Sequence, residues 1–289
     1  MGTKPMSDER RREGAKETRP FFIVSSGRSG TAMLHKALSA VPGVEMHHEY
    51  AVQITQPLAV KRYLGAADDG ETRKVLNETF GAAIAHAQGT HWGDSSNKLS
   101  WLVPDLAALF PQARFVHLVR DGRKVASSYF HKLAAETYDD RSNSVLQDWY
   151  DGKTSLPPPE KPYWWPVPRR GDAMAGAFRR FDQFQRICWH WAEVNRVALG
   201  ALAALPHERT LFVKLEDLTG SPALLRQMYD FLGLPFRDAD FAAFARPHNV
   251  NKPEDRLLDA AQTAQFEAIA GPMMETLGYA GTPEYAVNY

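Results

Sequence analysis

Residues 21–38 read FFIVSSGRSGTAMLHKAL, and this stretch decides the fold. The apolar run at 21–24 is typical of a buried strand, and residues 32–38 have the composition of a helix. A turn of small residues with one arginine joins the two elements. Such a turn directs backbone N–H groups and a helix N-terminus at one spot, which favours a bound phosphate or sulfate. The sequence therefore predicts an anion site on a strand–turn–helix unit.

The turn differs from a Walker A loop, whose pattern is G-x-x-x-x-G-K-[ST]. Residues 25–31 lack the early glycine, and no lysine precedes Thr31; the cation, Arg28, lies inside the turn. A guanidinium is planar and permanently charged, and it suits a tetrahedral oxyanion. Because short motifs often match by chance, an ordinary tight turn between a strand and a helix is the alternative interpretation.

A second turn of this kind follows residues 114–119, an apolar run with β-branched members that predicts a buried strand of a parallel sheet. Asp121 is the expected N-cap of a helix over 124–130. Arg120 then lies at the carboxyl end of the strand and Ser128 two turns into the helix, where ligands of open α/β sheets bind. One ligand with two anionic groups could contact both turns. In the alternative interpretation, the arginines of this turn form only surface ion pairs.

Residues 26–31 and 118–128 together resemble the two cofactor loops of sulfotransferases that use 3′-phosphoadenosine 5′-phosphosulfate (PAPS). The resemblance implies that the first loop binds the 5′-phosphosulfate and that Arg120, with Ser128 eight residues later, binds the 3′-phosphate. The implied contacts in the first loop are Gly27, Arg28, Ser29, Gly30, Thr31 and Ala32. Other stretches that fit the family in order and spacing are residues 109–114, 214–218, 231–234 and 277–279. With its arginine, the first loop is most similar to those of tyrosylprotein sulfotransferases and many bacterial relatives.

The activity implied by this resemblance is in-line transfer of a sulfuryl group from PAPS to a hydroxyl or amine, with release of adenosine 3′,5′-bisphosphate. The acceptor would be a small molecule, a glycan or a lipid, and the sequence does not identify it. Arg28 would stabilise the charge that develops on the 5′-phosphate, helped by N–H groups of the turn. The scheme requires no metal.

The catalytic base is sought in residues 44–50. Glu49 lies 21 residues after Arg28, the spacing of the catalytic glutamate in tyrosylprotein sulfotransferases, so the resemblance implies that Glu49 is the base. His48 is the second candidate, because histidine titrates near neutrality. Adjacent positions of a strand face opposite sides, so His47 and His48 are not expected to serve one site. A metal pair, or plain surface residues, is the alternative interpretation of these histidines.

One departure from the family lies in residues 93–98. Relatives carry a lysine before the helix that leads to the second strand, and Ser95 occupies that position here. Either Lys98 replaces the lysine, or Ser95 and Asn97 supply neutral hydrogen bonds. Near the C-terminus, Lys252 lies in a stretch that resembles the loop closing over the cofactor, which makes it a further candidate phosphate contact. An exposed loop lysine is the alternative.

Composition agrees with a globular enzyme. The chain has 289 residues, 44% of them hydrophobic and 24% charged, enough for one large domain with a substantial core. Its formal net charge is zero, so we expect neither nucleic acid nor an anionic membrane as a partner. The single cysteine, Cys188, excludes an intrachain disulfide and a cysteine-rich metal site. No apolar stretch reaches the ~20 residues of a membrane span and no signal peptide is evident, so a cytoplasmic protein is expected, with a homodimer left open.

The alternation of strands and helices predicts an α/β fold of the P-loop-like, three-layer kind, with a central, mostly parallel sheet flanked by helices. Residues 1–19 are expected to be a flexible N-terminal tail, and residues 20–289 a single domain. Further predicted elements are helices at 99–109, 174–205, 222–232 and 257–277 and a strand at 210–215. Residues 137–172, rich in proline and tryptophan, predict a long loop inserted over the acceptor. An oligomer contact is the alternative for this insertion.

Two other functions share this fold or its ligands. A P-loop kinase or nucleotide hydrolase would need a lysine in the first turn and a carboxylate at a strand end for Mg²⁺. Neither is evident, although Asp121 follows a strand. A non-catalytic nucleotide-binding protein would bind adenosine 3′,5′-bisphosphate without transferring sulfate.

Overall fold

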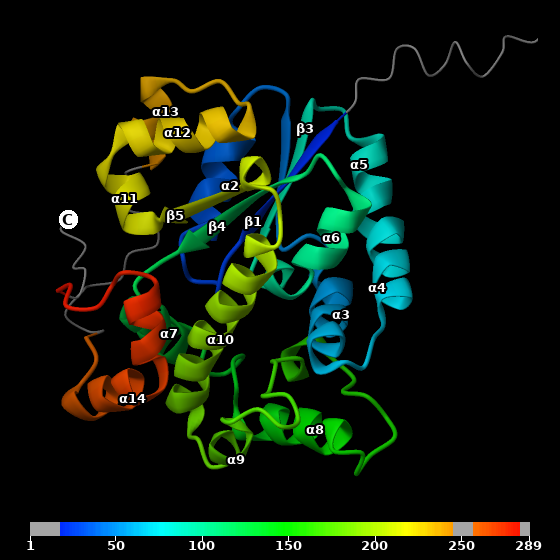
Figure 1. The fold of residues 1–289 in the computed structure, drawn as a ribbon, viewed down its shortest axis with the longest axis vertical. Coiled ribbons are helices and arrows are strands. Elements are labelled where there is room, and N and C mark those ends of the chain that lie inside the picture. The colour runs from blue at the N-terminus through cyan, green and yellow to red at the C-terminus, as the bar shows by residue number, and fades with distance from the viewer. Residues whose placement is uncertain (1–17, 245–256, 284–289) are drawn as a thin grey trace, which may run out of the picture.

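The computed structural model describes residues 18–244 and 257–283. A five-strand sheet with the order β2-β3-β1-β4-β5 lies at its centre (Figure 1). The strands are β1 (Arg19–Val24), β2 (Val44–His48), β3 (His91–Ser96), β4 (Arg114–Val119) and β5 (Thr210–Lys214). Each pairing in this sheet is parallel, so the carboxyl ends of the strands meet at one edge. The predicted α/β fold with a central parallel sheet is confirmed.

Alternation along β1 assigns side chains to the two faces of the sheet. Phe22 and Val24 pack into a core shared with α3, α6 and α10, whereas Phe21 and Ile23 pack into a core shared with α2 and α12. These helices are α2 (Thr31–Ser39), α3 (Val52–Leu64), α6 (Val103–Leu109), α10 (Gln183–Ala203) and α12 (Pro222–Leu232). Helices therefore cover both faces, as a parallel sheet requires, and this gives the three predicted layers (Figure 1).

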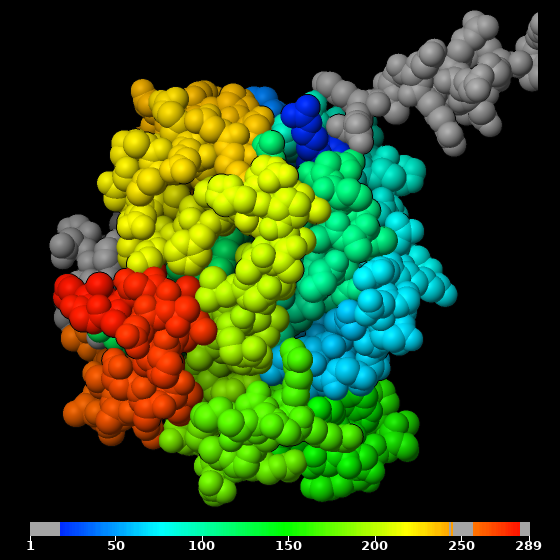
Figure 2. All heavy atoms as spheres, in the orientation of Figure 1, coloured from blue at the N-terminus to red at the C-terminus, as the bar shows by residue number. Residues whose placement is uncertain are grey.

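The remaining helices surround this frame. They are α4 (Asp69–Leu76), the π-helix η1 (Asn77–Gly81), α5 (Ala82–His86), η2 (Leu99–Trp101), α7 (Gly122–Lys132), α8 (Asp140–Tyr150), η3 (Lys161–Tyr163), α9 (Ala175–Phe178), η4 (His207–Arg209), α11 (Leu215–Gly220), α13 (Asp238–Phe244) and α14 (Ala260–Thr276). α10 packs against α14, and the two lie side by side in Figures 1 and 2. Within the described part of the chain, no helix is long and apolar enough to cross a membrane.

Several predicted elements have the expected positions. The strands predicted at 21–24, 114–119 and 210–215 correspond to β1, β4 and β5. α12 begins at a proline behind the N-cap Ser221, whose side chain accepts a backbone hydrogen bond, as predicted. α14 lies within the helix predicted at 257–277.

Two other predicted helices have different bounds. The helix expected over 174–205 begins later, because Asp182 and Gln185 form a capping box that starts α10, and α9 is a separate short helix. The segment 99–109 is not one helix, because the 3-10 turn η2 and α6 are separated at Leu102.

The sequence does not predict β3, because this strand lacks the apolar run of its neighbours. It reads HWGDSS, yet all six residues are buried. Two of its polar side chains have partners from a distant part of the chain. Asp94 Oδ1 accepts a hydrogen bond from the Tyr50 N–H at 3.1 Å, and Ser95 Oγ lies 3.0 Å from His48 Nδ1. Tertiary hydrogen bonds thus stabilise a buried strand whose sequence is polar.

The segment 137–172 is more ordered than the predicted loop. It contains α8, and Trp164 and Trp165 are buried in the core on the α10 face of the sheet. Their indole N–H groups donate to the backbone carbonyls of Pro158 and Glu136. In Figure 2 this green region forms the end of the molecule next to α3. Trp164 and Trp165 thus act as core residues, and Trp149 packs partly buried against that core.

Some predictions fall on residues that the structure does not describe. Residues 1–17 and 245–256 lie outside the described ranges, so Lys252 and most of the expected N-terminal tail stay predictions. The predicted C-terminal bound of the tail, residue 19, is too late, because Arg19 is the first residue of β1.

Candidate functional site

The turn between β1 and α2 has a backbone shape that only certain residues allow. Gly27, Arg28 and Gly30 have φ values of 78°, 53° and 89°, in the left-handed region. A Cβ at Gly27 would also lie 2.0 Å from the hydroxyl oxygen of Tyr129. Glycine is therefore required at this position both by the backbone and by the close approach of α7.

The N-terminus of α2 faces this turn without a side-chain cap. Within the described residues, no side chain caps the helix, and its first turn contains no acidic residue. Gly30 is the N-cap, and the Ser29 hydroxyl donates to the Gly27 carbonyl at 3.0 Å, inside the turn. The backbone N–H groups at the start of α2 thus form an electropositive end that suits an anion, as predicted from the sequence.

The two predicted turns meet in the structure. Arg28 Nε donates to Ser128 Oγ at 3.0 Å, although the two residues are 100 positions apart. Arg120 Nη1 donates to the backbone carbonyl of Arg28 at 2.9 Å. The parallel pairing of β1 with β4 brings the turns together, because both follow the carboxyl ends of adjacent strands.

The N-terminus of α7 is capped differently. Asp121 is its N-cap, as predicted, and its carboxylate accepts a hydrogen bond from the Arg123 N–H. The Arg123 side chain pairs with the same carboxylate, with Nη2 2.6 Å from Oδ2. Arg123 thus forms the local ion pair that was the alternative for this turn, whereas Arg120 reaches toward the first turn.

Glu49 lies directly after β2, at the same edge of the sheet. Its φ is 55°, and its N–H donates to the Ser95 carbonyl at 3.0 Å. Its charge favours the protonated forms of Lys98 and Tyr129, raising the pKa of each. Glu49 is therefore near enough to Lys98 and Tyr129 for its charge to act on both.

Lys98 is the buried cation of this site. Its side chain is almost fully enclosed, and its ammonium lies 4.5 Å from the centroid of the Trp165 ring. Burial lowers the pKa of Lys98 to about 8, although the Glu49 charge acts in the opposite direction. A buried cation suits an anionic ligand.

Ser95 and His48 face the other side of the sheet. The Ser95 carbonyl can only accept, so His48 Nδ1, at 2.9 Å from it, carries a proton and donates. The His48 ring lies 6.0 Å from that of His35 on α2, whereas His47 packs 4.9 Å from Trp92. The two histidines thus face opposite sides, as predicted, and Ser95 lies on the side of His48.

A layer of buried polar groups, of which the sequence singles out only Asn97, supports the first turn. The Tyr129 hydroxyl donates to the Ser26 carbonyl at 2.9 Å and accepts from Asn97 Nδ2 at 3.1 Å. Asp94 is fully buried nearby, and burial raises its pKa to about 7, with the Glu49 charge adding to the effect. These residues adjoin predicted ones in the chain, but their types alone carry no signal of a site.

A separate groove of about 650 Å³ lies between α6 and α10. Its lining includes Arg169, Arg196 and Arg209. Arg196 pairs with Glu193, and Arg209 donates to three backbone carbonyls. Two of its three cations thus already have partners within the chain. In the described ranges, no group of three or more His, Cys, Asp or Glu residues could hold a metal ion.

Comparison with known proteins finds a similarity to one family. Residues 20–156 match the model described as "Sulfotransferase family", and this range contains Arg28, Glu49, Arg120 and Ser128. No curated protein matches the chain. This part of the chain, residues 20–156, is therefore similar to sulfotransferases.

Solved structures of sulfotransferases are similar over most of the chain. The sulfotransferase domain from the curacin biosynthetic pathway has 15% sequence identity and a TM-score of 0.50, with 91% of this chain and 98% of that chain covered. The sulfotransferase domain of the Synechococcus PCC 7002 olefin synthase has 18% identity and a TM-score of 0.49, with 92% and 97% covered. Mouse sulfotransferase SULT7A1, complexed with PAP, has 12% identity and a TM-score of 0.41, with 92% and 90% covered. The first of these likenesses supports the fold.

Proposed function

We propose that this chain is a member of the sulfotransferase family that transfers a sulfuryl group from PAPS to a hydroxyl or amine acceptor and releases adenosine 3′,5′-bisphosphate. The convergence of the two anion-binding turns carries the proposal. At the carboxyl edge of the sheet, Arg28 donates to Ser128 and Arg120 donates to the Arg28 carbonyl. A nucleotide with anionic groups at two positions of one ribose would satisfy both turns.

The residues have distinct roles in the proposed reaction. The acceptor oxygen or nitrogen forms a bond to sulfur while the bond from sulfur to the bridging phosphate oxygen breaks. The electron pair of the breaking bond stays on the phosphate, so negative charge develops there. Arg28 and the uncapped N–H groups at the start of α2 stabilise that charge. Glu49 accepts the proton that the acceptor loses.

In this scheme Lys98 supplies a second cation, in place of the lysine that relatives carry at the Ser95 position. Its ammonium is buried beside Trp165 and within the field of Glu49. A cation in such a water-poor setting interacts strongly with an anionic donor. Lys98 would neutralise charge on the transferring group, and no metal is needed for that step.

The pH dependence of the reaction tests this role of Lys98. We expect kcat/KM to fall as the pH rises through about 8, because burial lowers the Lys98 pKa to about 8 and the free enzyme then loses a cation. Lys98→Arg keeps the charge, since a guanidinium stays protonated to about pH 12. The variant should shift the fall to higher pH in a profile of kcat/KM. If kcat/KM of Lys98→Arg fell at the same high pH as that of the wild type, the role of Lys98 would be contradicted.

A thermal shift panel without added metal tests the nucleotide assignment. Adenosine 3′,5′-bisphosphate should raise the melting temperature more than AMP, ATP or GTP, because a ligand that binds only the folded state stabilises it by mass action. Equal shifts for the bisphosphate and AMP would contradict the proposal. A larger shift with ATP or GTP would instead favour the kinase or hydrolase.

The Arg120→Ala variant tests whether Arg120 is responsible for the preference for the bisphosphate over AMP. Loss of a charged contact to the 3′-phosphate should weaken bisphosphate binding by roughly 10- to 100-fold and change AMP binding little. Isothermal titration of both nucleotides measures this difference. If the variant kept the full preference for the bisphosphate, Arg120 would not be the 3′-phosphate contact.

A further inference from the structure

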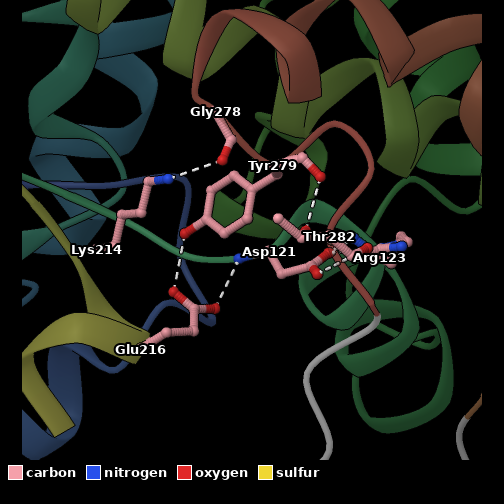
Figure 3. A network of polar contacts seen from close by, with 7 residues as sticks. All are labelled: Asp121, Arg123, Lys214, Glu216, Gly278, Tyr279 and Thr282. Atoms are coloured by element: carbon pink, nitrogen blue, oxygen red, sulfur yellow. Dashed lines mark hydrogen bonds and ion pairs between the residues drawn. The ribbon is translucent and has the colours of Figure 1, made fainter. Parts of the chain in front are cut away.

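Glu216, in the first turn of α11, connects the second cofactor turn to the C-terminal part of the chain. Its Oε1 accepts a hydrogen bond from the Asp121 N–H at 3.0 Å. Its Oε2 accepts one from the Tyr279 hydroxyl at 2.8 Å, and Figure 3 shows both contacts. One carboxylate thus joins three segments that are distant in the sequence.

Tyr279 is held firmly in this place. Its side chain is almost fully buried, and the Lys214 ammonium lies 4.4 Å from the centroid of its ring. The same ammonium donates to the Gly278 carbonyl at 2.9 Å. Gly278 has a φ of 70°, which turns the chain after α14 so that Tyr279 points at Glu216. Burial and the Glu216 charge both raise the pKa of Tyr279, so its hydroxyl keeps the proton that it donates.

A second contact holds the same turn from its other side. Arg123 Nη2 donates to the Thr282 carbonyl at 3.1 Å while it pairs with the Asp121 carboxylate (Figure 3). The segment 277–282 therefore contacts the turn through Tyr279 and Glu216 on one side, and through Thr282 and Arg123 on the other.

The Glu216 contact bears directly on Arg120. The N–H of Asp121 belongs to the peptide unit that follows Arg120, so fixing this N–H restricts the backbone dihedral that orients the Arg120 side chain. That side chain reaches the first turn, where it donates to the Arg28 carbonyl. A change at Tyr279 can thus alter the orientation of the Arg120 side chain, through the Glu216 carboxylate and the peptide unit between Arg120 and Asp121.

We propose that Tyr279 and Glu216 are positioning residues for nucleotide recognition, and that segment 277–282 holds Arg120 in the geometry that binds the 3′-phosphate. The inference rests on the proposed function. Neither residue needs to touch the nucleotide. Their effect should appear in the preference for a 3′-phosphate and in the KM for PAPS, with kcat largely kept.

The test is Tyr279→Phe, which removes one hydroxyl and keeps the ring. Isothermal titration with adenosine 3′,5′-bisphosphate and with AMP should show a preference reduced by about 5- to 10-fold, because a hydrogen bond to a carboxylate is lost. AMP affinity should stay close to that of the wild type. A variant that kept the wild-type ratio of the two affinities would overturn the inference.

Tyr229→Phe is the matched control. The Tyr229 hydroxyl is buried in the core on the α12 side, and within the described residues it has no hydrogen-bond partner. Removing it should leave the nucleotide preference unchanged. An equal loss of preference in this control would overturn the inference, because the effect would then reflect general loosening of the fold.

Glu216→Leu provides a second variant if Tyr279→Phe proves unstable. A leucine has no acceptor oxygen, so the contacts to the Asp121 N–H and to the Tyr279 hydroxyl are both lost. It should also reduce the preference for the bisphosphate, and an unchanged preference would overturn the inference. A wild-type protein that does not distinguish the bisphosphate from AMP would contradict the proposed function itself, which keeps the two failures distinguishable.

Discussion

Replacement of Arg28 by alanine is expected to lower kcat by about 10²- to 10³-fold, the range seen when one preorganised donor to a developing charge is removed. The reason is that negative charge grows on the leaving phosphate only as the sulfuryl group departs. Arg28 should therefore stabilise the transition state more than the bound substrate, and KM should change less than kcat. Steady-state kinetics with PAPS and a competent acceptor measure both values.

Arg28→Lys separates the charge from the shape of the side chain. Lysine keeps a cation but loses the planar fork, so this variant should retain part of the activity. Both variants keep a Cβ at a position whose φ is 53°, so their backbone cost is matched. Near-normal turnover by Arg28→Ala would exclude the proposed role.

Glu49→Gln should fold and bind adenosine 3′,5′-bisphosphate normally, yet transfer sulfate to an alcohol about 10²- to 10⁴-fold more slowly. Glutamine has nearly the shape of glutamate but cannot accept the proton. An alcohol is the right acceptor for this test, because a phenol of low pKa needs little help from a base. The measurement is single-turnover transfer under saturating nucleotide.

His48→Asn is the parallel control for the base. His48 faces α2, where its Nδ1 donates to the Ser95 carbonyl, so we expect a much smaller effect on transfer. If His48→Asn abolished activity while Glu49→Gln remained active, the two assignments would have to be exchanged.

Much of this site could be predicted because its parts are local. The strand and turn that carry Arg28 are specified by an apolar run and small residues within about ten positions. The same holds for Arg120 and Ser128 around their own turn. Their meeting could also be predicted, because the turns that follow adjacent parallel strands must lie at the same edge of the sheet.

Other features escape prediction because their stability comes from distant partners. The polar strand β3 is buried only because Tyr50 and His48 provide hydrogen bonds for its side chains. Segment 137–172 has the composition of a binding loop, but long-range packing makes its Trp164 and Trp165 part of the core. Composition alone cannot distinguish these outcomes, since an aromatic side chain gains similar free energy in a core or against a ligand.

The sequence by itself determined the class of the fold and the two turns that follow β1 and β4, because these depend on short-range pattern and on the geometry of parallel strands. Only the tertiary structure decided that Lys98 is buried beside Trp165, whereas Ser95 contacts His48. It also decided that Glu216 connects Asp121 to Tyr279, which lies 63 residues after Glu216 in the chain. Such contacts depend on which side of a strand or turn each side chain faces, and a single residue of register reverses that side.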